Sequence, residues 1–303
     1  MPRHLPPNHD DRMSRVQLAL DGLSVGDALG ERFFFPPNSE LVAVRTPPLG
    51  SWQWTDDTAM ALSIADLLAT QGGIDQDRLA AAFARRFMAE PDRGYGRGAF
   101  GLLNQIDGGV PWDEAAQAMF GGQGSMGNGA AMRAAPIGAY FAEHLDDVAD
   151  HAAAASQVTH MHPEGIAGGV AVAVAAGWAC RQLIGLENAS GFFEAILSCL
   201  RDGPTRRAIE EAANHPNLST REAAARFGNG SHVMAPDTVP FCLWCAWRFR
   251  DDYEAAIWEA ISVAGDIDTN AAIVGGIVSL FVGVDGIPAE WIQRREPLPR
   301  IGE

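Results

Sequence analysis

Two short oxygen-rich segments, far apart in the sequence, carry side chains that could bind a cation. They are Thr55–Thr58 (TDDT) and Asp266–Asn270 (DIDTN). Each stands immediately before an apolar stretch with helical spacing, and the positive end of a helix dipole stabilises one acid at such a position. Capping explains one acid in each segment but not two. The alternative, two independent helix caps whose second acid is solvated, stays open at this point.

If the two segments meet in space, four carboxylates lie within a few ångströms of one another. Each like-charge pair at about 4 Å costs on the order of 4 kcal/mol at an effective dielectric near 20, and a bound cation would reverse that sign. Asp266 and Asp268 are two residues apart, so both reach one ion only if the chain bends, which Gly265 allows. The candidate ligands offer hard oxygen, which suits Mg²⁺ or Mn²⁺ and disfavours zinc: Thr55, Asp56, Asp57, Asp266, Asp268 and Thr269.

A glycine-rich segment, residues 121–129 (GGQGSMGNG), is the second chemical signal. Backbone amides in such a loop can approach a phosphate closely, and a following helix N-terminus adds favourable potential. The segment contains the pattern G-x-G-x-x-G, but residues 112–120 before it have helical spacing rather than the strand that a dinucleotide-binding unit needs. A phosphate-binding loop and a flexible turn between helices are therefore the two interpretations.

Three further sites carry weaker signals. Tyr95, in the loop Gly94–Gly98, could either pack or cover a ligand, and His160 stands at the end of an expected helix, where a histidine is more often structural than catalytic. Cys242 and Cys245 form a lone C-x-x-C among aromatic residues, so we expect them to pack in the core rather than to bind zinc.

The elements that must position these residues are predicted to be helices. No stretch alternates apolar and polar residues with the period of two that a half-buried strand requires, whereas apolar residues recur at spacings of three and four. The early patterns cover 16–23, 60–68 and 75–88. Further helices are expected at about 129–143, 147–160, 163–184, 190–201, 205–215, 219–226, 238–250, 251–263 and 269–283. The irregular segments between them, 31–54, 91–98 and 121–128, are expected to carry the site.

Composition limits the class of protein. Of 303 residues, 47% are hydrophobic and 20% are charged, which favours a folded all-α domain over disorder. We expect one domain at 12–303 behind a disordered arm at 1–11. The net charge of −16 disfavours nucleic-acid and membrane partners, and the apolar stretches 166–180 and 271–284 fall short of a membrane span. The N-terminus lacks an apolar signal region, so a cytoplasmic protein is expected.

Taken together, the ordered segments resemble the ADP-ribosylglycohydrolase family, which includes the dinitrogenase reductase-activating glycohydrolases and the ADP-ribosyl-acceptor hydrolases. The match runs through nearly the whole chain. It comprises Gly26–Gly30 (GDALG), Trp54–Thr58 (WTDDT), Arg93–Gly96 (RGYG), Gly124–Ala130 (GSMGNGA), Thr159-His160 and Asp266–Ala271 (DIDTNA). The resemblance implies a single compact, orthogonal multi-helix domain.

The resemblance also implies roles for individual residues. Thr55, Asp56, Asp57, Asp266, Asp268 and Thr269 correspond to ligands of a binuclear magnesium centre, in which Mn²⁺ is a possible substitute. Gly124, Ser125, Gly127 and Asn128 correspond to the loop that holds diphosphate and ribose, His160 to a ligand contact, and Phe120 and Met126 to an adenine clamp. Tyr95 belongs to the same implied ADP-ribose site. An ADP-ribosylated protein or small conjugate is the implied partner.

The implied activity is hydrolysis at C1 of the distal ribose, with Asp56, Asp57 and Glu31 as catalytic candidates. Many relatives carry a functional Glu four residues after the glycine matched by Gly30, where this chain has Phe34, and Glu31 is the acid nearest to that position. This departure favours an arginine-linked over a serine-linked acceptor. Two other functions remain as alternatives: a non-catalytic binder of ADP-ribose or nucleotide on the same scaffold, and a metal-dependent phosphohydrolase.

Overall fold

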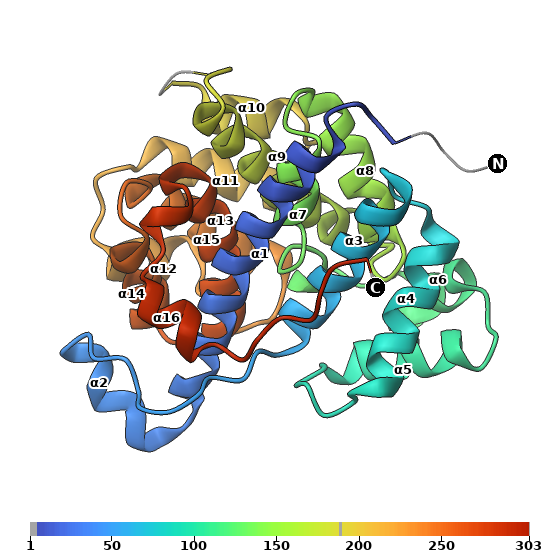
Figure 1. The fold of residues 1–303 in the computed structure, drawn as a ribbon, viewed down its shortest axis with the longest axis horizontal. Coiled ribbons are helices and arrows are strands. Elements are labelled where there is room, and N and C mark those ends of the chain that lie inside the picture. Colours follow the sequence, from blue (N-terminus) through green and yellow to red (C-terminus); the bar gives the residue numbers. More distant parts are fainter. Residues whose placement is uncertain (1–4, 188–189, 303) are drawn as a thin grey trace.

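A computed structural model describes residues 5–187 and 190–302, and within these ranges the chain forms helices and no β-strand. Two isolated bridges, Trp52 with Arg295 and Gly127 with Met234, are the ladder-type pairings found in these ranges. The predicted all-α class is therefore confirmed. Figure 1 shows one body of packed helices, with α1 running through its middle.

The helices account for most of the chain. In order, they are α1 (His9–Glu31), α2 (Ser39–Ala43), α3 (Asp56–Gln71), α4 (Gln76–Ala89), α5 (Arg97–Asp107), α6 (Trp112–Gly122), α7 (Ala135–Tyr140), α8 (Leu145–Gln157), α9 (Pro163–Leu183), α10 (Phe192–Ser198), α11 (Pro204–Asn214), α12 (Thr220–Phe227), α13 (Ala235–Arg248), α14 (Tyr253–Ser262), α15 (Ile267–Val282) and α16 (Ala289–Arg294). Short 3₁₀ turns lie at 32–34, 36–38, 128–130 and 284–286.

Some predicted boundaries are wrong. The helix expected at 129–143 is a 3₁₀ turn at 128–130 followed by α7, because Pro136 lacks an N–H and disfavours helical backbone before it. Helices α2, α5 and α16 were not expected. Residues 9–11, assigned to the disordered arm at 1–11, form the start of α1, where two acids face the helix dipole; residues 1–4 of that arm lie outside the described residues.

Helix α1 and helix α15 pack with their backbones in direct contact. A Cβ on Gly26 would lie 2.1 Å from the carbonyl oxygen of Ala271, and a Cβ on Gly30 would lie 2.7 Å from the Cα of Asp268. Such distances admit no side chain larger than hydrogen, so this glycine spacing of four is what lets the two helices approach. The contact fixes the end of α1 against the beginning of α15, where the second acidic segment lies.

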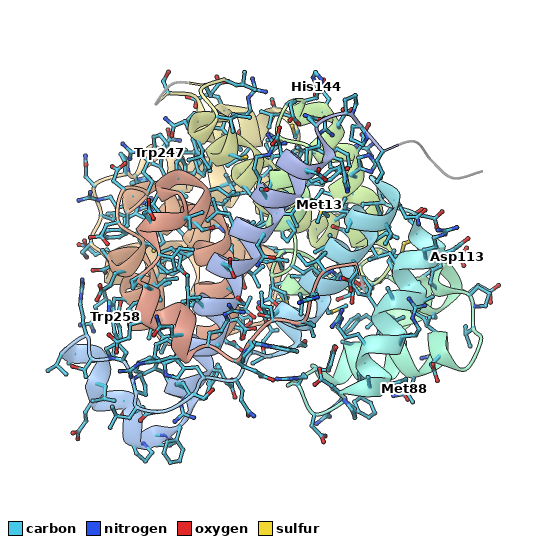
Figure 2. All side chains as sticks on the ribbon, in the orientation of Figure 1. Met13, Met88, Asp113, His144, Trp247 and Trp258 are labelled. Carbon is cyan, nitrogen blue, oxygen red and sulfur yellow. The ribbon has the colours of Figure 1, made fainter. Side chains whose placement is uncertain are left out.

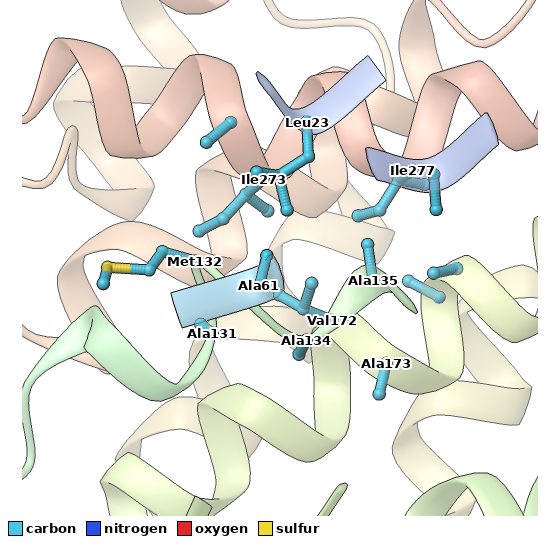
Figure 3. Close-up of a cluster of buried hydrophobic side chains, with 14 of the residues drawn as sticks. Leu23, Ala61, Ala131, Met132, Ala134, Ala135, Val172, Ala173, Ile273 and Ile277 are labelled. Atoms are coloured by element: carbon cyan, nitrogen blue, oxygen red, sulfur yellow. The ribbon is translucent and has the colours of Figure 1, made fainter. Parts of the chain in front are cut away.

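The core lies where α1, α3, α7, α9 and α15 converge. Figure 3 shows Leu23 of α1, Ala61 of α3, Val172 of α9 and Ile273 of α15 around the segment 131–135. All four side chains are fully buried. Burial of an aliphatic side chain of this size stabilises a fold by about 1.5–3 kcal/mol, so these contacts hold the helix starts that carry the acidic segments.

Helix α9 is the described helix whose length and composition would suit a membrane span. Its 21 residues include a window of mean hydropathy 1.3, of which 72% is buried inside the protein. This burial is typical of a core helix. Cys242 and Cys245 of α13 are also buried and free, as expected of core residues.

The segment between α1 and α3 is held to the body by aromatic contacts near its two ends, Phe33 with Trp258 of α14 and Trp52 with Trp291 of α16. Phe33 meets Trp258 of α14 edge to face at 5.8 Å, whereas its neighbours Phe34 and Phe35 are exposed. Figure 2 shows Trp258 on the same side of α1 as Trp247, with Met88 of α4 and Asp113 of α6 on the opposite side. The cleft described next takes residues from both sides.

Candidate active site

A cavity of about 580 Å³ brings together the two acidic segments and the glycine-rich loop. This volume lies within the roughly 300–1,000 Å³ typical of small-ligand pockets. Of the predicted site residues, those that line the cavity are Asp56, Asp57, Phe120, Gly124, Ser125, Met126, Gly127, Asn128, His160, Asp266, Asp268 and Thr269. Segments about 200 residues apart in the sequence thus contribute to one site.

The first acidic segment is held in place by a carboxylate from α1. Asp27 is fully buried and accepts hydrogen bonds from the backbone N–H of Thr55 (2.9 Å) and of Thr58 (3.2 Å). Its oxygens also accept from the hydroxyls of Thr55 (2.8 Å) and Thr58 (2.5 Å). Thr55 in turn caps α3 by accepting from the N–H of Asp57. Asp27 therefore orients the first turn of α3 and both of its aspartates.

The second acidic segment begins at a bend in the chain. Gly265 has a φ of +79°, and a Cβ at this position would lie 2.1 Å from the carbonyl oxygen of Asn229. Asp266 then occupies the N-cap position of α15, and Asp268 lies in its first turn. The predicted bend at Gly265 is confirmed, and it directs both carboxylates into the cavity.

Three carboxylates form the centre of the acidic cluster. Asp27, Asp57 and Asp268 each place an oxygen within 4.8 Å of the others. Asp57 is 1% exposed, and its Oδ1 has no hydrogen-bond partner among the described residues. An unpartnered buried oxygen beside two further carboxylates is costly unless a cation or a proton compensates it.

The pKa values follow from this crowding. Burial, followed by the charges of Asp268 and Asp27, raises the pKa of Asp57 well above its ordinary value. Burial and Asp27 raise the pKa of Asp56 to about 7, and burial raises that of Asp27 to about 6 despite its hydrogen bonds. The pKa of Asp268 is raised well above normal and that of Asp266 is raised, both mainly by burial. A hard-oxygen cluster that resists ionisation fits a divalent cation.

The glycine-rich loop is fixed to the acidic cluster and to the segment before α13. Asn128 donates from Nδ2 to Asp266 Oδ2 (2.6 Å) and to the hydroxyl of Thr238 (3.0 Å). The N–H of Asn128 donates to the carbonyl oxygen of Val233, and Ser125 Oγ accepts from the N–H of Gly127 (3.1 Å). These hydrogen bonds hold the loop as a wall of the cavity.

Two large side chains of this region border the cavity mouth. Phe120 has a φ of +51° at a kink that ends α6, and its side chain is 66% exposed. A left-handed backbone costs a bulky residue free energy, and such strain gathers at functional sites. Met126 lines the same cavity. Phe120 thus lies exposed where a planar group could stack on it.

Comparison with known proteins identifies the family. The model of the ADP-ribosylglycohydrolase family matches residues 8–302, which is nearly the whole chain. The chain belongs to this family. The expectation of an enzyme of the glycohydrolase class is thereby confirmed.

The relatives of this glycohydrolase agree with that assignment. It is 28% identical to human ADP-ribosylhydrolase ARH3, over 94% of this chain and 90% of that protein. It is 27% identical to ADP-ribosylarginine hydrolase Tri1 of Pseudomonas putida (strain GB-1), over 94% of this chain and 75% of that protein. A solved structure described as an ADP-ribosylglycohydrolase-related protein complex has a TM-score of 0.70 and 25% identity, covering 95% and 94% of the two chains.

Three predicted residues of the glycohydrolase lie outside the cavity lining. Glu31, at the end of α1, is exposed, and burial together with Asp27 raises its pKa. Tyr95 packs edge to face on Phe87 at 5.0 Å, so of its two predicted roles the structure shows packing. Thr55 is buried beneath the acidic cluster, with its hydroxyl 3.2 Å from Asp57 Oδ2.

Sequence reasoning missed two buried residues of the site. Asp27 stood in the segment GDALG but received no role, although an acid inside an otherwise apolar helical stretch is itself a signal. Arg133 is 1% exposed and stacks 4.5 Å above the ring of Phe83 while lining the cavity. Its signal was a lone cation within an alanine-rich stretch. Asp27 lies beneath the cavity surface, and Arg133 forms part of that surface.

Proposed function

We propose that this glycohydrolase removes ADP-ribose from a modified acceptor by hydrolysing the bond between C1 of the distal ribose and the acceptor atom. The observation that carries the proposal is the single cavity in which an acidic cluster adjoins a glycine-rich wall. The family match supports it, as do the names of the two relatives, an ADP-ribosylhydrolase and an ADP-ribosylarginine hydrolase. A phosphate-binding wall beside a cation-binding floor suits an ADP-ribose conjugate.

The proposed cofactors are two Mg²⁺ ions, with Mn²⁺ as a substitute. The proposed ligands are Thr55, Asp56, Asp57, Asp266, Asp268 and Thr269. Support comes from the hard-oxygen donor set and from the unpartnered, buried Oδ1 of Asp57. When bound, such ions neutralise the carboxylates, polarise water and orient ribose hydroxyls.

Asp56 is the proposed catalytic carboxylate. Bond cleavage at an anomeric carbon builds positive charge on the sugar, and a nearby carboxylate stabilises that charge. Asp56 lines the cavity and is less buried than Asp57, whose two oxygens face Thr55 and the acidic cluster. A carboxylate that faces the cavity can also accept a proton from a water molecule held there. Asp57 then serves mainly as a ligand.

The glycine-rich wall is proposed to hold the ADP portion. Gly124, Ser125, Gly127 and Asn128 offer backbone and side-chain donors to the diphosphate and the adjoining ribose, and Asn128 connects that wall to Asp266. Exposed Phe120, with Met126 beside it, is proposed to contact adenine.

An arginine-linked acceptor is favoured over a serine-linked one. The carboxylates that line the described cavity are Asp56, Asp57, Asp266 and Asp268, and Glu31 is not among them. Phe34 is 46% exposed and carries no acid to the position where relatives have one. The proposed partner is therefore an arginine-modified protein or small conjugate, and Glu31→Gln should leave its hydrolysis within about twofold of wild type.

The test is to incubate the full chain with arginine-linked, serine-linked and polymeric ADP-ribose, with Mg²⁺ or with EDTA. The expected result is release of ADP-ribose with Mg²⁺, fastest from the arginine linkage, and loss of turnover with EDTA. Free phosphate as the product would contradict the proposal and favour a phosphohydrolase. Tight ADP-ribose binding that ignores EDTA, with no turnover of any conjugate, would favour the binder.

A further inference from the structure

His160 is one member of a chain of three buried polar side chains. Arg133 Nη2 donates to Thr159 Oγ1 at 2.7 Å, and Thr159 Oγ1 lies 2.6 Å from His160 Nδ1. Arg133 and Thr159 are 1% and 4% exposed, and His160 is 8% exposed at the cavity wall. Three different chemical groups are thus hydrogen-bonded in a row along the cavity wall.

The position of each proton along this chain follows from which groups can accept. A guanidinium has no acceptor, so Thr159 Oγ1 must accept from Arg133 and its own hydrogen needs a different acceptor. Among the described residues, His160 Nδ1 is the acceptor that this hydroxyl contacts. If Nδ1 carried a proton, a buried hydroxyl hydrogen would be left without a partner, which is unfavourable. Nδ1 is therefore the accepting nitrogen of a neutral ring.

The opposite edge of the ring carries the proton and faces the glycine-rich wall. A Cβ on Gly127 would lie 3.3 Å from His160 Nε2, and a Cβ on Gly129 would lie 3.4 Å from it. Gly165 of α9 leaves room for the other side of the ring, because a Cβ on Gly165 would lie 3.3 Å from Cδ2 of His160. Nε2 makes no hydrogen bond within the part of the chain that the structure describes, so it is available to a ligand in the cavity.

The surroundings also keep the ring neutral. Burial, with a smaller effect from the positive charge of Arg133, lowers the pKa of His160 to about 3. Burial lowers the pKa of Arg133 to about 9, and the charge of Asp56 partly opposes this, so the guanidinium stays protonated at neutral pH. Arg133 therefore remains a hydrogen-bond donor to Thr159 under the conditions of an assay.

We propose that Arg133 and Thr159 are positioning residues that fix the Nε2–H tautomer of His160, so that the ring presents a permanent hydrogen-bond donor to an anionic oxygen at the glycine-rich wall. The anionic oxygen is that of a phosphate group, and this identification rests on the proposed function. The tautomer itself follows from the hydrogen bonds within the protein.

The direct test is ¹⁵N NMR of the histidine rings in the full chain, with the His160 signal assigned by its absence from His160→Gln. The expected result is an unprotonated Nδ1 and a protonated Nε2 for His160 at neutral pH. A proton on Nδ1, or comparable amounts of both tautomers, would overturn the proposal. This measurement needs no ligand and no turnover, so it is independent of the proposed function.

The functional test compares Thr159→Val, which keeps the shape but removes the hydroxyl, with Thr159→Ser, which keeps the hydroxyl. ADP-ribose affinity, measured by calorimetry with Mg²⁺, should fall about tenfold in the valine variant and stay near wild type in the serine variant. The KM should rise with it while kcat changes little, as expected when ground-state binding is lost. Equal affinities of Thr159→Val and wild type would overturn the proposed role of Arg133 and Thr159 in positioning His160.

The matched control is Ser156→Ala, which removes a buried hydroxyl in the last turn of α8, three residues before Thr159. Ser156 Oγ donates to the carbonyl oxygen of Ala152 and takes no part in the chain of side chains. This variant should bind ADP-ribose as wild type does. An equal loss of affinity in it and in Thr159→Val would contradict the proposed positioning of His160 by Thr159. If wild type binds no ADP-ribose, the proposed function fails, and the NMR result alone decides whether the tautomer is fixed.

Discussion

Helices α3 and α8 carry the same pair of aspartates in their first turns but in opposite surroundings. Asp56 and Asp57 lie in the first turn of α3, and Asp146 and Asp147 lie in the first turn of α8. The two carboxylates of α8 are exposed, whereas Asp57 is almost fully buried. The helix dipole favours an acid at both places, so it does not explain the difference.

The difference comes from what packs against each helix start. Asp27 of α1 binds the turn before α3, and Asp268 of α15 brings a further carboxylate within 4.8 Å of Asp57. At the start of α8, by contrast, Asp146 and Asp147 face solvent. The same dipeptide therefore only complements the helix dipole where it is solvated, and it forms a candidate cation site where two other helices exclude the water.

The largest expected effect is on turnover and separates the two helix starts. Asp57→Asn should lower kcat/KM for an ADP-ribose conjugate by roughly 10³-fold, about 4 kcal/mol of transition-state stabilisation, because it removes a buried cation ligand. Asp147→Asn, the matched change at α8, should leave kcat/KM within about twofold of wild type. Steady-state kinetics with both variants checks this. Equal effects would show that the two starts do not differ in function.

The second prediction tests the helix contact that creates the difference. Gly26→Ala should destabilise the fold by about 3 kcal/mol, because its Cβ would lie 2.1 Å from a backbone oxygen of α15 that cannot yield. Gly101→Ala, in the exposed middle of α5, meets no described atom within 4 Å and should stabilise by about 0.5–1 kcal/mol. Urea unfolding measures both. A mild effect of Gly26→Ala would argue against the close approach of α1 and α15.

The third prediction concerns stability without a cation. The pKa of Asp56 is raised to about 7, so the folded state binds more protons than the unfolded state between pH 4 and 7, and stability falls as pH rises through that window. Asp56→Asn removes this penalty and should raise the Tm in EDTA at pH 7 by about 3 °C, with little change at pH 4.

Calorimetry at the two pH values checks the sign of this effect, and Asp146→Asn is its control at α8. A lower Tm for Asp56→Asn at pH 7 in EDTA would mean that the ionised carboxylate stabilises the fold. The expectation that ionisation of Asp56 destabilises the cation-free fold would then be wrong.

The contrast between the two helix starts also shows what sequence can predict. The acidic segments, the bend at Gly265 and the glycine-rich loop were predictable because each depends on neighbouring residues. The role of Asp27 was not, because it depends on α1 reaching the turn before α3. Tyr95 and Glu31 were placed in the site by resemblance, yet the local packing on Phe87 and the exposed end of α1 leave both out of the cavity lining. Pro136 shortened a helix that apolar spacing alone extends to 129–143.

The most direct measurement is the anomalous scattering of Mn²⁺ in crystals of the full chain grown with that ion. The account predicts density bound by Asp57 and Asp268, at ligand distances of about 2.0–2.2 Å, and no comparable density at Asp146 and Asp147. Saturating Mn²⁺ that leaves the carboxylates of α3 and α15 without bound density would contradict the shared cation site.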